Sequence, residues 1–119
     1  MYNFQKLIVW QEARLLVKNI YHLVADYPTT EKFSLVDQMK RASISIVSNI
    51  AEGSGRKSQN DQAHFYTMAF SSAMELLNQL IISSDLGYIT PCEMREAEHR
   101  IQKIAMMISG LRKSCYQKK

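Results

Sequence analysis

Apolar residues recur at alternating intervals of three and four positions through most of the chain, which is the spacing of one face of an α-helix. Residues that interrupt helices divide the pattern into four runs, because Pro28, Gly53 and Gly87 each follow one of the first three. Four long helices with short connections indicate an all-α fold, an antiparallel up-down-up-down four-helix bundle formed by a single domain, residues 1–119. The pattern predicts helices over about residues 7–27, 34–52, 58–86 and 91–116.

Residue types at the predicted helix ends support these limits. Thr90 has the side chain of an N-terminal cap, Pro91 suits the first helical position, and Glu93 completes a capping box. Gly53 and Gly87 each suit the left-handed conformation that closes a helix. We therefore expect the last helix to begin at Thr90-Pro91 and the two preceding helices to end at these glycines.

The third predicted helix lacks the charged outer face that a bundle helix normally has. Residues 58–90 contain no Lys or Arg and only three acidic residues. A helix that is apolar over most of its circumference is buried on more than one side, so we expect self-association through this helix. The alternative is that Tyr2 and Phe4 cover it. The candidate oligomer-interface residues are Phe65, Phe70, Met74, Leu77 and Ile81.

The net charge of +4 is unevenly distributed along the chain. Residues 1–57 carry +3 and residues 91–119 carry +4, whereas residues 58–90 carry −3. A basic surface attracts the phosphates of nucleic acids, so RNA is a candidate partner. No apolar run approaches the ~18 residues that a membrane-spanning helix needs, and no secretory signal is present, so we expect a cytoplasmic protein.

The nucleic-acid-binding candidates are the basic pairs of the chain. Arg56 and Lys57 come just before the third predicted helix, whose first free N–H groups and dipole favour anions. The Gly-Ser-Gly-Arg-Lys-Ser stretch around them lacks the preceding strand and the spacing of a nucleotide phosphate loop. A solvated basic face and an ordinary turn between helices are the alternative interpretations. The candidates are Lys40, Arg41, Arg56, Lys57, Arg112 and Lys113, with Lys118-Lys119 as a further pair.

Two acid–histidine pairs have the i, i+3 spacing of ligands that bind metals inside some helical bundles. The pairs are Asp61 with His64 and Glu96 with His99. The apolar stripes of their helices place all four side chains on outer faces, so we expect no metal site and no cofactor. Because the chain also shows no recognisable nucleophile motif, we expect no enzymatic activity.

Several stretches, which together cover nearly the whole chain in order, resemble one protein family. These stretches are Phe4 followed by Leu7-Ile8-Val9-Trp10-Gln11, then Gln38-Met39-Lys40-Arg41-Ala42, then residues 45–56, then Glu75-Leu76 with Gln79-Leu80, and finally Leu86-Gly87-Tyr88-Ile89. They resemble the four-helix-bundle proteins that are encoded in intervening sequences of bacterial large-subunit ribosomal RNA, also labelled S23 ribosomal proteins. The Asn49-Ile50-Ala51-Glu52-Gly53 stretch is the most specific part.

The resemblance implies a bundle that assembles as a homopentamer and associates with RNA. It also implies a fold similar to that of the accessory protein of diversity-generating retroelements, a basic pentamer that works with a reverse transcriptase and RNA. The residues that match the family's characteristic polar positions and glycine are Asn49, Glu52, Gly53, Arg56 and Glu75. A structural role is expected for Asn49 and Glu52, and Arg56 is a candidate salt-bridge partner of Glu52 or Glu75.

The leading interpretation is therefore a non-enzymatic, homo-oligomeric helical bundle that binds structured RNA or a ribonucleoprotein through basic surface residues. Such binding is mainly electrostatic and weakly sequence-specific. The alternative is a protein–protein adaptor or scaffold with no nucleic-acid role.

Overall fold

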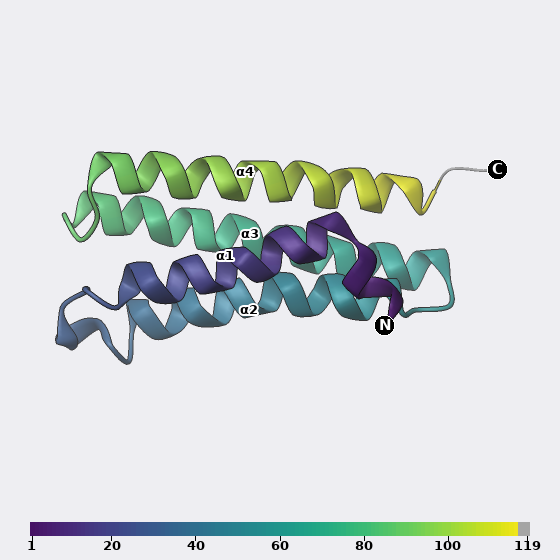
Figure 1. The fold of residues 1–119 in the computed structure, drawn as a ribbon, viewed down its shortest axis with the longest axis horizontal. Coiled ribbons are helices and arrows are strands. Elements are labelled where there is room, and N and C mark those ends of the chain that lie inside the picture. Colours follow the sequence, from purple (N-terminus) through teal and green to yellow (C-terminus); the bar gives the residue numbers. More distant parts are fainter. Residues whose placement is uncertain (117–119) are drawn as a thin grey trace.

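The computed structural model describes residues 1–116, and the regular structure of these residues is entirely helical (Figure 1). The prediction of an all-helical chain with four long helices is confirmed, and residues 1–116 contain no strand. Among these residues, no helix combines the length and the apolar composition that crossing a membrane requires. The elements in chain order are η1 Asn3–Lys6, α1 Ile8–Val24, η2 Thr29–Glu31, α2 Leu35–Ser54, α3 Gln59–Asp85 and α4 Pro91–Ser114.

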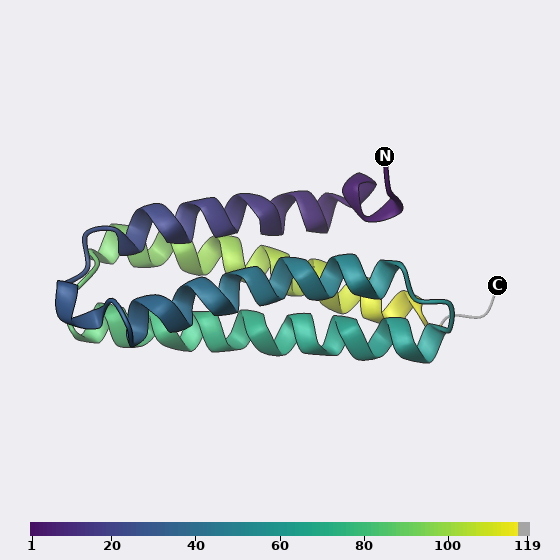
Figure 2. The same ribbon diagram turned by 90° about the horizontal axis from the view of Figure 1, so that it is seen from below.

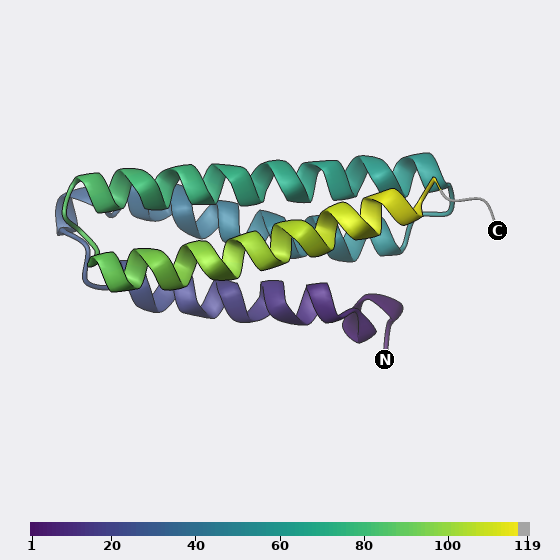
Figure 3. The same cartoon turned by 90° about the horizontal axis from the view of Figure 1, so that it is seen from above.

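The four long helices lie side by side in a body that measures 49 × 22 × 22 Å (Figures 1 and 2). The ribbon reverses direction at each connection between them. α2 packs against α1 and α3, while α4 packs against α3 and α1, so the helices follow one another around the core in chain order (Figure 3). The sides formed by the α1–α2 and α3–α4 pairs are therefore opposite sides of the bundle.

The core consists of one apolar stripe from each helix. The α2–α3 pair is the most extensively packed, and it contains small buried residues such as Ala42, Ser43 and Ala73. Small side chains allow two helix backbones to approach closely, because less volume separates them. The core stripes are Ala13, Leu16 and Ile20 of α1; Met39, Ala42, Ile46 and Ile50 of α2; Tyr66, Ala69, Ala73, Leu76 and Leu80 of α3; and Ala97, Ile101, Ile104 and Ile108 of α4.

The α3–α4 connection has the chemistry that its sequence predicts. Gly87 adopts a left-handed φ of 77°, and the Tyr88 N–H donates to the Ser83 carbonyl at 2.9 Å, which closes α3. The Glu93 N–H donates to Thr90 Oγ1 at 3.1 Å, and the Thr90 N–H donates to Glu93 Oε1 at 2.8 Å. The predicted Gly87 closure and capping box are both confirmed.

A side-chain hydrogen bond joins the two connections that share one end of the bundle. Tyr88 Oη, after α3, donates to Glu31 Oε2 in η2 at 2.7 Å. Ser34 Oγ donates to the other carboxylate oxygen of Glu31, also at 2.7 Å. Hydrogen bonds to the charged form, first from Ser34 and then from Tyr88, hold the pKa of Glu31 below its ordinary value.

Candidate functional site

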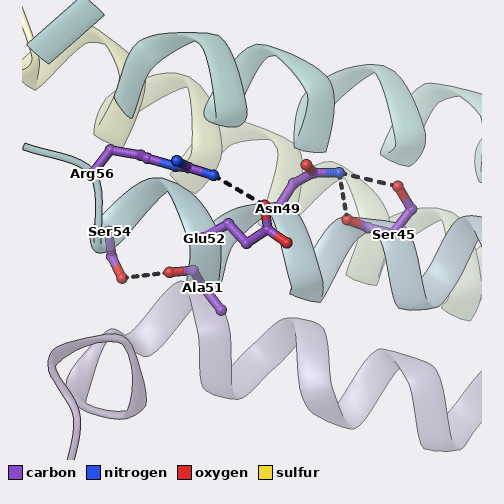
Figure 4. Close-up of polar contacts among 6 residues, drawn as sticks. All are labelled: Ser45, Asn49, Ala51, Glu52, Ser54 and Arg56. Carbon is purple, nitrogen blue, oxygen red and sulfur yellow. Dashed lines mark hydrogen bonds and ion pairs between the residues drawn. The ribbon is translucent and has the colours of Figure 1, made fainter. Parts of the chain in front are cut away.

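The polar residues of the Asn49–Gly53 stretch lie on the last turns of α2 (Figure 4). Asn49 Nδ2 donates to the Ser45 carbonyl at 2.9 Å and lies 3.1 Å from Ser45 Oγ. Ser45 Oγ is 2.8 Å from Ser72 Oγ of α3, so the three side chains form a polar link between two helices. Since a half-buried amide needs hydrogen-bond partners, these contacts satisfy the Asn49 side chain within the α2–α3 pair.

Arg56 folds back over the end of α2 toward Glu52 (Figure 4). Its guanidinium lies 3.6 Å from the Glu52 carboxylate and 4.4 Å from the ring centre of Phe65. Of the two carboxylates considered as its partner, the structure therefore selects Glu52, and Glu75 is exposed on α3. The combined ion pair and cation–π contact fastens the α2–α3 connection to both helices.

Gly53 is buried inside α2, against the ring of Tyr66. The prediction that Gly53 closes the helix in a left-handed conformation is wrong, because α2 continues through Ser54 and the positive φ among the described glycines belongs to Gly87. The glycine is needed for close approach instead, since a Cβ atom there would lie 2.6 Å from Tyr66 Cε1. Burial raises the pKa of Tyr66 to about 12.

The fold brings two of the predicted basic pairs to the same end of the bundle. Arg56 and Lys57 lie in the α2–α3 connection, and Arg112 and Lys113 lie in the last turn of α4. Gln62 connects these two regions, because its Nε2 donates to the Arg56 carbonyl at 3.0 Å while its Oε1 lies 3.9 Å from Cys115 Sγ. We call Lys57, Arg112 and Lys113 the basic end; none of them has an ion-pair partner within residues 1–116.

The third predicted basic pair lies apart from the basic end. Lys40 and Arg41 precede Arg56 by about four turns of α2, or roughly 24 Å. Lys40 Nζ lies 4.7 Å from the ring centre of Tyr21, and Arg41 Nε lies 3.0 Å from the Asp37 carboxylate. Both charges are therefore engaged within the chain. Lys118-Lys119 lies outside the described residues.

The apolar residues of α3 lie on its flanks rather than all around it. Phe65, Phe70, Met74 and Leu77 are half-buried beside α2 or α4, and among the interface candidates Ile81 is exposed. Exposed polar residues, including Thr67, Ser71, Glu75 and Asn78, occupy the outermost face. Tyr2 and Phe4 do not supply the cover considered as the alternative, because η1 packs on α1 and α2 and Phe4 contacts Trp10 at 5.0 Å.

Two apolar surfaces remain open, and sequence spacing did not identify either as a unit. The α3–α4 groove has a volume of about 920 Å³; its apolar lining includes Phe70, Met74, Met106 and Tyr116, with Arg112 and Lys113 on its rim. The α1–α2 groove, of about 310 Å³, lies between Trp10, Arg14 and Val17 of α1 and Ile44, Val47, Ser48 and Ala51 of α2. Arg14 also lies over the Trp10 ring, 5.5 Å from its centre.

The acid–histidine pairs lie where the apolar stripes place them. Asp61, His64, Glu96 and His99 are all exposed. Within residues 1–116, no three His, Cys, Asp or Glu side chains gather as metal ligands would. The described surface offers charge at the basic end, apolar contact in these two grooves, and a pocket of about 270 Å³ between α1 and α4 whose lining includes Asn19, Glu96 and Arg100.

Comparison with known proteins gives one family and one fold. The sequence model of a family described as "23S rRNA-intervening sequence protein" matches residues 5–110. A crystal structure of a protein of unknown function from the S23 ribosomal protein family of Bacteroides thetaiotaomicron is similar, with a TM-score of 0.83 at 21% sequence identity. The alignment covers 89% of this chain and 96% of that chain. No curated protein matches the sequence.

Proposed function

The chain belongs to the family of 23S rRNA-intervening sequence proteins, and from this premise we propose that it is a non-enzymatic RNA-binding bundle. The proposed ligand is structured RNA, free or in a ribonucleoprotein, and the proposed active form is an antiparallel bundle assembled as a homo-oligomer in the cytoplasm. The family resemblance implies five copies. The family's description links its members to ribosomal RNA, which makes ribosomal RNA the first ligand to test.

The observation that carries the proposal is the separation of charge along the bundle. The basic end holds Lys57, Arg112 and Lys113, and Asp61 is the exposed acid nearest to them in sequence. The opposite end consists of the α1–α2 and α3–α4 connections with the last residue of α3 and the first five residues of α2 and α4. It holds more acidic than basic residues, namely Asp26, Glu31, Asp37, Asp85 and Glu93 against Lys32 and Arg95. Unpaired cations gathered at one place bind phosphates, because each contact releases a condensed counterion.

Binding of this kind reads the RNA backbone rather than its bases. Lys and Arg contacts to phosphates fix position and orientation but carry no sequence information directly. In an oligomer each copy repeats the basic end, so weak contacts add up when a single RNA spans several copies. The expected behaviour is salt-dependent binding to structured RNA with little discrimination among sequences.

A fluorescence anisotropy titration of a ribosomal RNA fragment, repeated over a salt series, tests this proposal. Raising salt from ~50 to ~200 mM is expected to weaken binding by about tenfold or more if several phosphates are contacted. The Lys57→Ala, Arg112→Ala double variant is expected to bind weakly and with a shallower salt slope. The matched control is Lys32→Ala, Arg95→Ala, which removes one Lys and one Arg from the opposite end.

The controls decide how a negative result is interpreted. Sedimentation velocity on both double variants shows whether the assembly is unchanged, so that lost binding is separated from lost association. No binding by the unmodified protein at low salt contradicts RNA binding, and equal losses in the two double variants contradict the assignment to the basic end.

A further inference from the structure

We infer that the α3–α4 groove takes up one unpaired nucleotide of a structured RNA, with the base in the apolar part of the groove and the phosphate on its basic rim. The inference rests on the RNA binding of the proposed function and adds which part of the RNA this groove recognises. It draws on three features of the groove: an aromatic ring without a partner, a rim of a single charge sign, and an open position in the surface of α4.

The ring of Tyr116 is available for stacking. Tyr116 follows α4, lines the groove and is 58% exposed. Within residues 1–116, its ring has neither a cation nor a second ring beside it. The other exposed aromatic rings of these residues each have such a partner, namely Tyr2 with Phe4, Tyr21 with Lys40, and Phe33 with Lys32. An unpaired nucleobase has flat faces that stack on an aromatic side chain.

Apolar side chains from two helices accompany this ring. Phe70 and Met74 of α3 are half-buried in the groove, and Met106 of α4 is 75% exposed there. Methionine fills irregular gaps and makes favourable contacts with aromatic rings. A base that leaves water for this groove therefore gains apolar contact from both helices.

The rim of the groove favours an anion. Arg112 and Lys113 belong to the lining and have no ion-pair partner within residues 1–116, and none of the lining residues is acidic. Gln102 and Ser109 add hydrogen-bonding groups to the same lining. The edge of an unpaired base presents donors and acceptors to such groups, whereas an acyl chain presents none. Apolar walls, polar side chains and adjacent cations together match a nucleotide.

The surface of α4 is open at Gly110. A Cβ atom on Gly110 would meet nothing within 4 Å, and this residue is part of the lining. Met106 lies four positions before it and Lys113 three positions after it, so the three residues are neighbours on one face of the helix. The open position therefore separates the exposed methionine from the basic rim, and it leaves room for the sugar that joins a base to its phosphate.

The nucleotide in this groove has to be an unpaired one. Inside a paired RNA helix the bases are stacked on one another, and side chains reach them in loops, bulges and ends instead. Stacking on an aromatic residue tolerates any sequence, because every base has a flat face. A base contact of this kind is therefore compatible with the weak sequence dependence expected of the proposed function.

Two RNA hairpins with the same number of phosphates test the inference. One carries a single bulged adenosine, and the other carries an abasic residue at the same position. In fluorescence anisotropy the wild type is expected to bind the adenosine hairpin about tenfold or more tightly than the abasic hairpin. Tyr116→Ala and Gly110→Leu are each expected to abolish this difference, the first by removing the ring and the second by filling the groove. Phe33→Ala, which removes an exposed ring beside a lysine at the opposite end, is the control and is expected to keep the difference.

The abasic hairpin separates the base contact from other effects of these variants. Its affinity is expected to stay within about twofold for Tyr116→Ala and Gly110→Leu, with an unchanged salt slope, because neither variant removes a charge. Arg112→Ala is instead expected to weaken the binding of both hairpins and to reduce the salt slope by about one. Circular dichroism checks that each variant is folded.

Each remaining outcome contradicts the inference. Equal affinity of the wild type for the two hairpins overturns the base site and leaves salt-dependent RNA binding intact. A difference that persists in either groove variant places the base outside this groove. A parallel loss for both hairpins in Tyr116→Ala or Gly110→Leu, accompanied by a lower mass in sedimentation velocity, assigns the groove to a second copy instead. No binding of either hairpin at low salt overturns the inference and the proposed RNA binding together.

Discussion

Gly53 of α2 faces the ring of Tyr66 of α3 so closely that a Cβ atom on residue 53 would lie 2.6 Å from Tyr66 Cε1 and 3.0 Å from Phe65 Cβ. The two helices are the most extensively packed pair in the bundle, and Tyr66 is almost completely buried. The glycine in the family's most specific stretch is thus explained by contact between helices rather than by a turn.

Gly53→Ala is expected to destabilise the protein by about 1–3 kcal/mol, because an added methyl group forces buried neighbours to move. This loss is expected despite the better helix propensity of alanine, which favours alanine by about 1 kcal/mol in a helix interior and by less at Gly53, the last residue but one of α2. Equilibrium urea unfolding measures the difference. The double variant Gly53→Ala, Tyr66→Leu is expected to lose less unfolding free energy than the two single variants lose in sum.

Gly110 provides the matched control for this prediction. It lies in the interior of α4, and a Cβ atom there would meet nothing within 4 Å. Gly110→Ala is expected to stabilise the protein by about 0.5–1 kcal/mol, since only helix propensity changes. Equal effects of the two glycine substitutions would contradict the role assigned to Tyr66.

The buried hydroxyl of Tyr66 predicts a loss of stability at alkaline pH. Its pKa is raised from 10.0 to about 12 in the folded protein, so the unfolded chain releases this proton first. The stability is fully present below the unfolded pKa and is lost as the pH rises through the folded pKa. Unfolding free energies measured from neutral pH to ~12 should fall steeply for the wild type and less steeply for Tyr66→Phe. Tyr27, whose pKa burial also raises, remains as a second contributor in that variant.

Arg56 is expected to contribute more to stability than an ordinary surface ion pair. Arg56→Ala removes both the Glu52 contact and the Phe65 contact, with an expected loss of about 0.5–1.5 kcal/mol. The comparison is Arg41→Ala, because Arg41 has the same i, i+4 spacing from Asp37 but lies over no aromatic ring among the described residues. Its expected loss is about 0.3–0.5 kcal/mol, and urea unfolding of the two variants in parallel distinguishes them.

The Tyr88–Glu31 hydrogen bond predicts a stability difference between the wild type and Tyr88→Phe that disappears at acid pH. Tyr88→Phe is expected to lower the thermal midpoint at neutral pH, because the Glu31 carboxylate loses a donor. The pKa of Glu31 is lowered in the folded protein, so this contribution is present above the unfolded pKa and is lost as the pH falls through the folded pKa. Midpoints of wild type and variant, measured by circular dichroism, should therefore converge in acid. Tyr21→Phe is the control, because the Tyr21 hydroxyl has no hydrogen bond to residues 1–116. This variant should show no such pH-dependent difference from the wild type.

The sequence predicted the helices well because each one carries local information about its own ends and its own buried face. The α4 stripe of Ala97, Ile101, Ile104 and Ile108 keeps its 3–4 spacing without interruption, and all four residues are buried. The Thr90 cap depends only on Glu93, which is three positions further along the chain. Properties of this kind do not depend on which helix lies opposite.

The candidate site depends on contacts between helices, which spacing alone does not give. A glycine near the end of a helix suggests a left-handed closure, and only the approach of Tyr66 shows why Gly53 is instead a buried residue in the last turn of α2. Arg56 had two possible carboxylate partners in the sequence, and the turn geometry of α2 selects Glu52. The gathering of Lys57 with Arg112 and Lys113 likewise follows from where α4 ends relative to α3.

The separation of charge gives this molecule an electric dipole along its longest dimension, 49 Å. A polyanion at a distance exerts a torque on such a body, attracting one tip and repelling the other, so the bundle is turned before it arrives. In the proposed RNA binding, the first encounter should therefore be end-on, with the helix axes pointing toward the ligand.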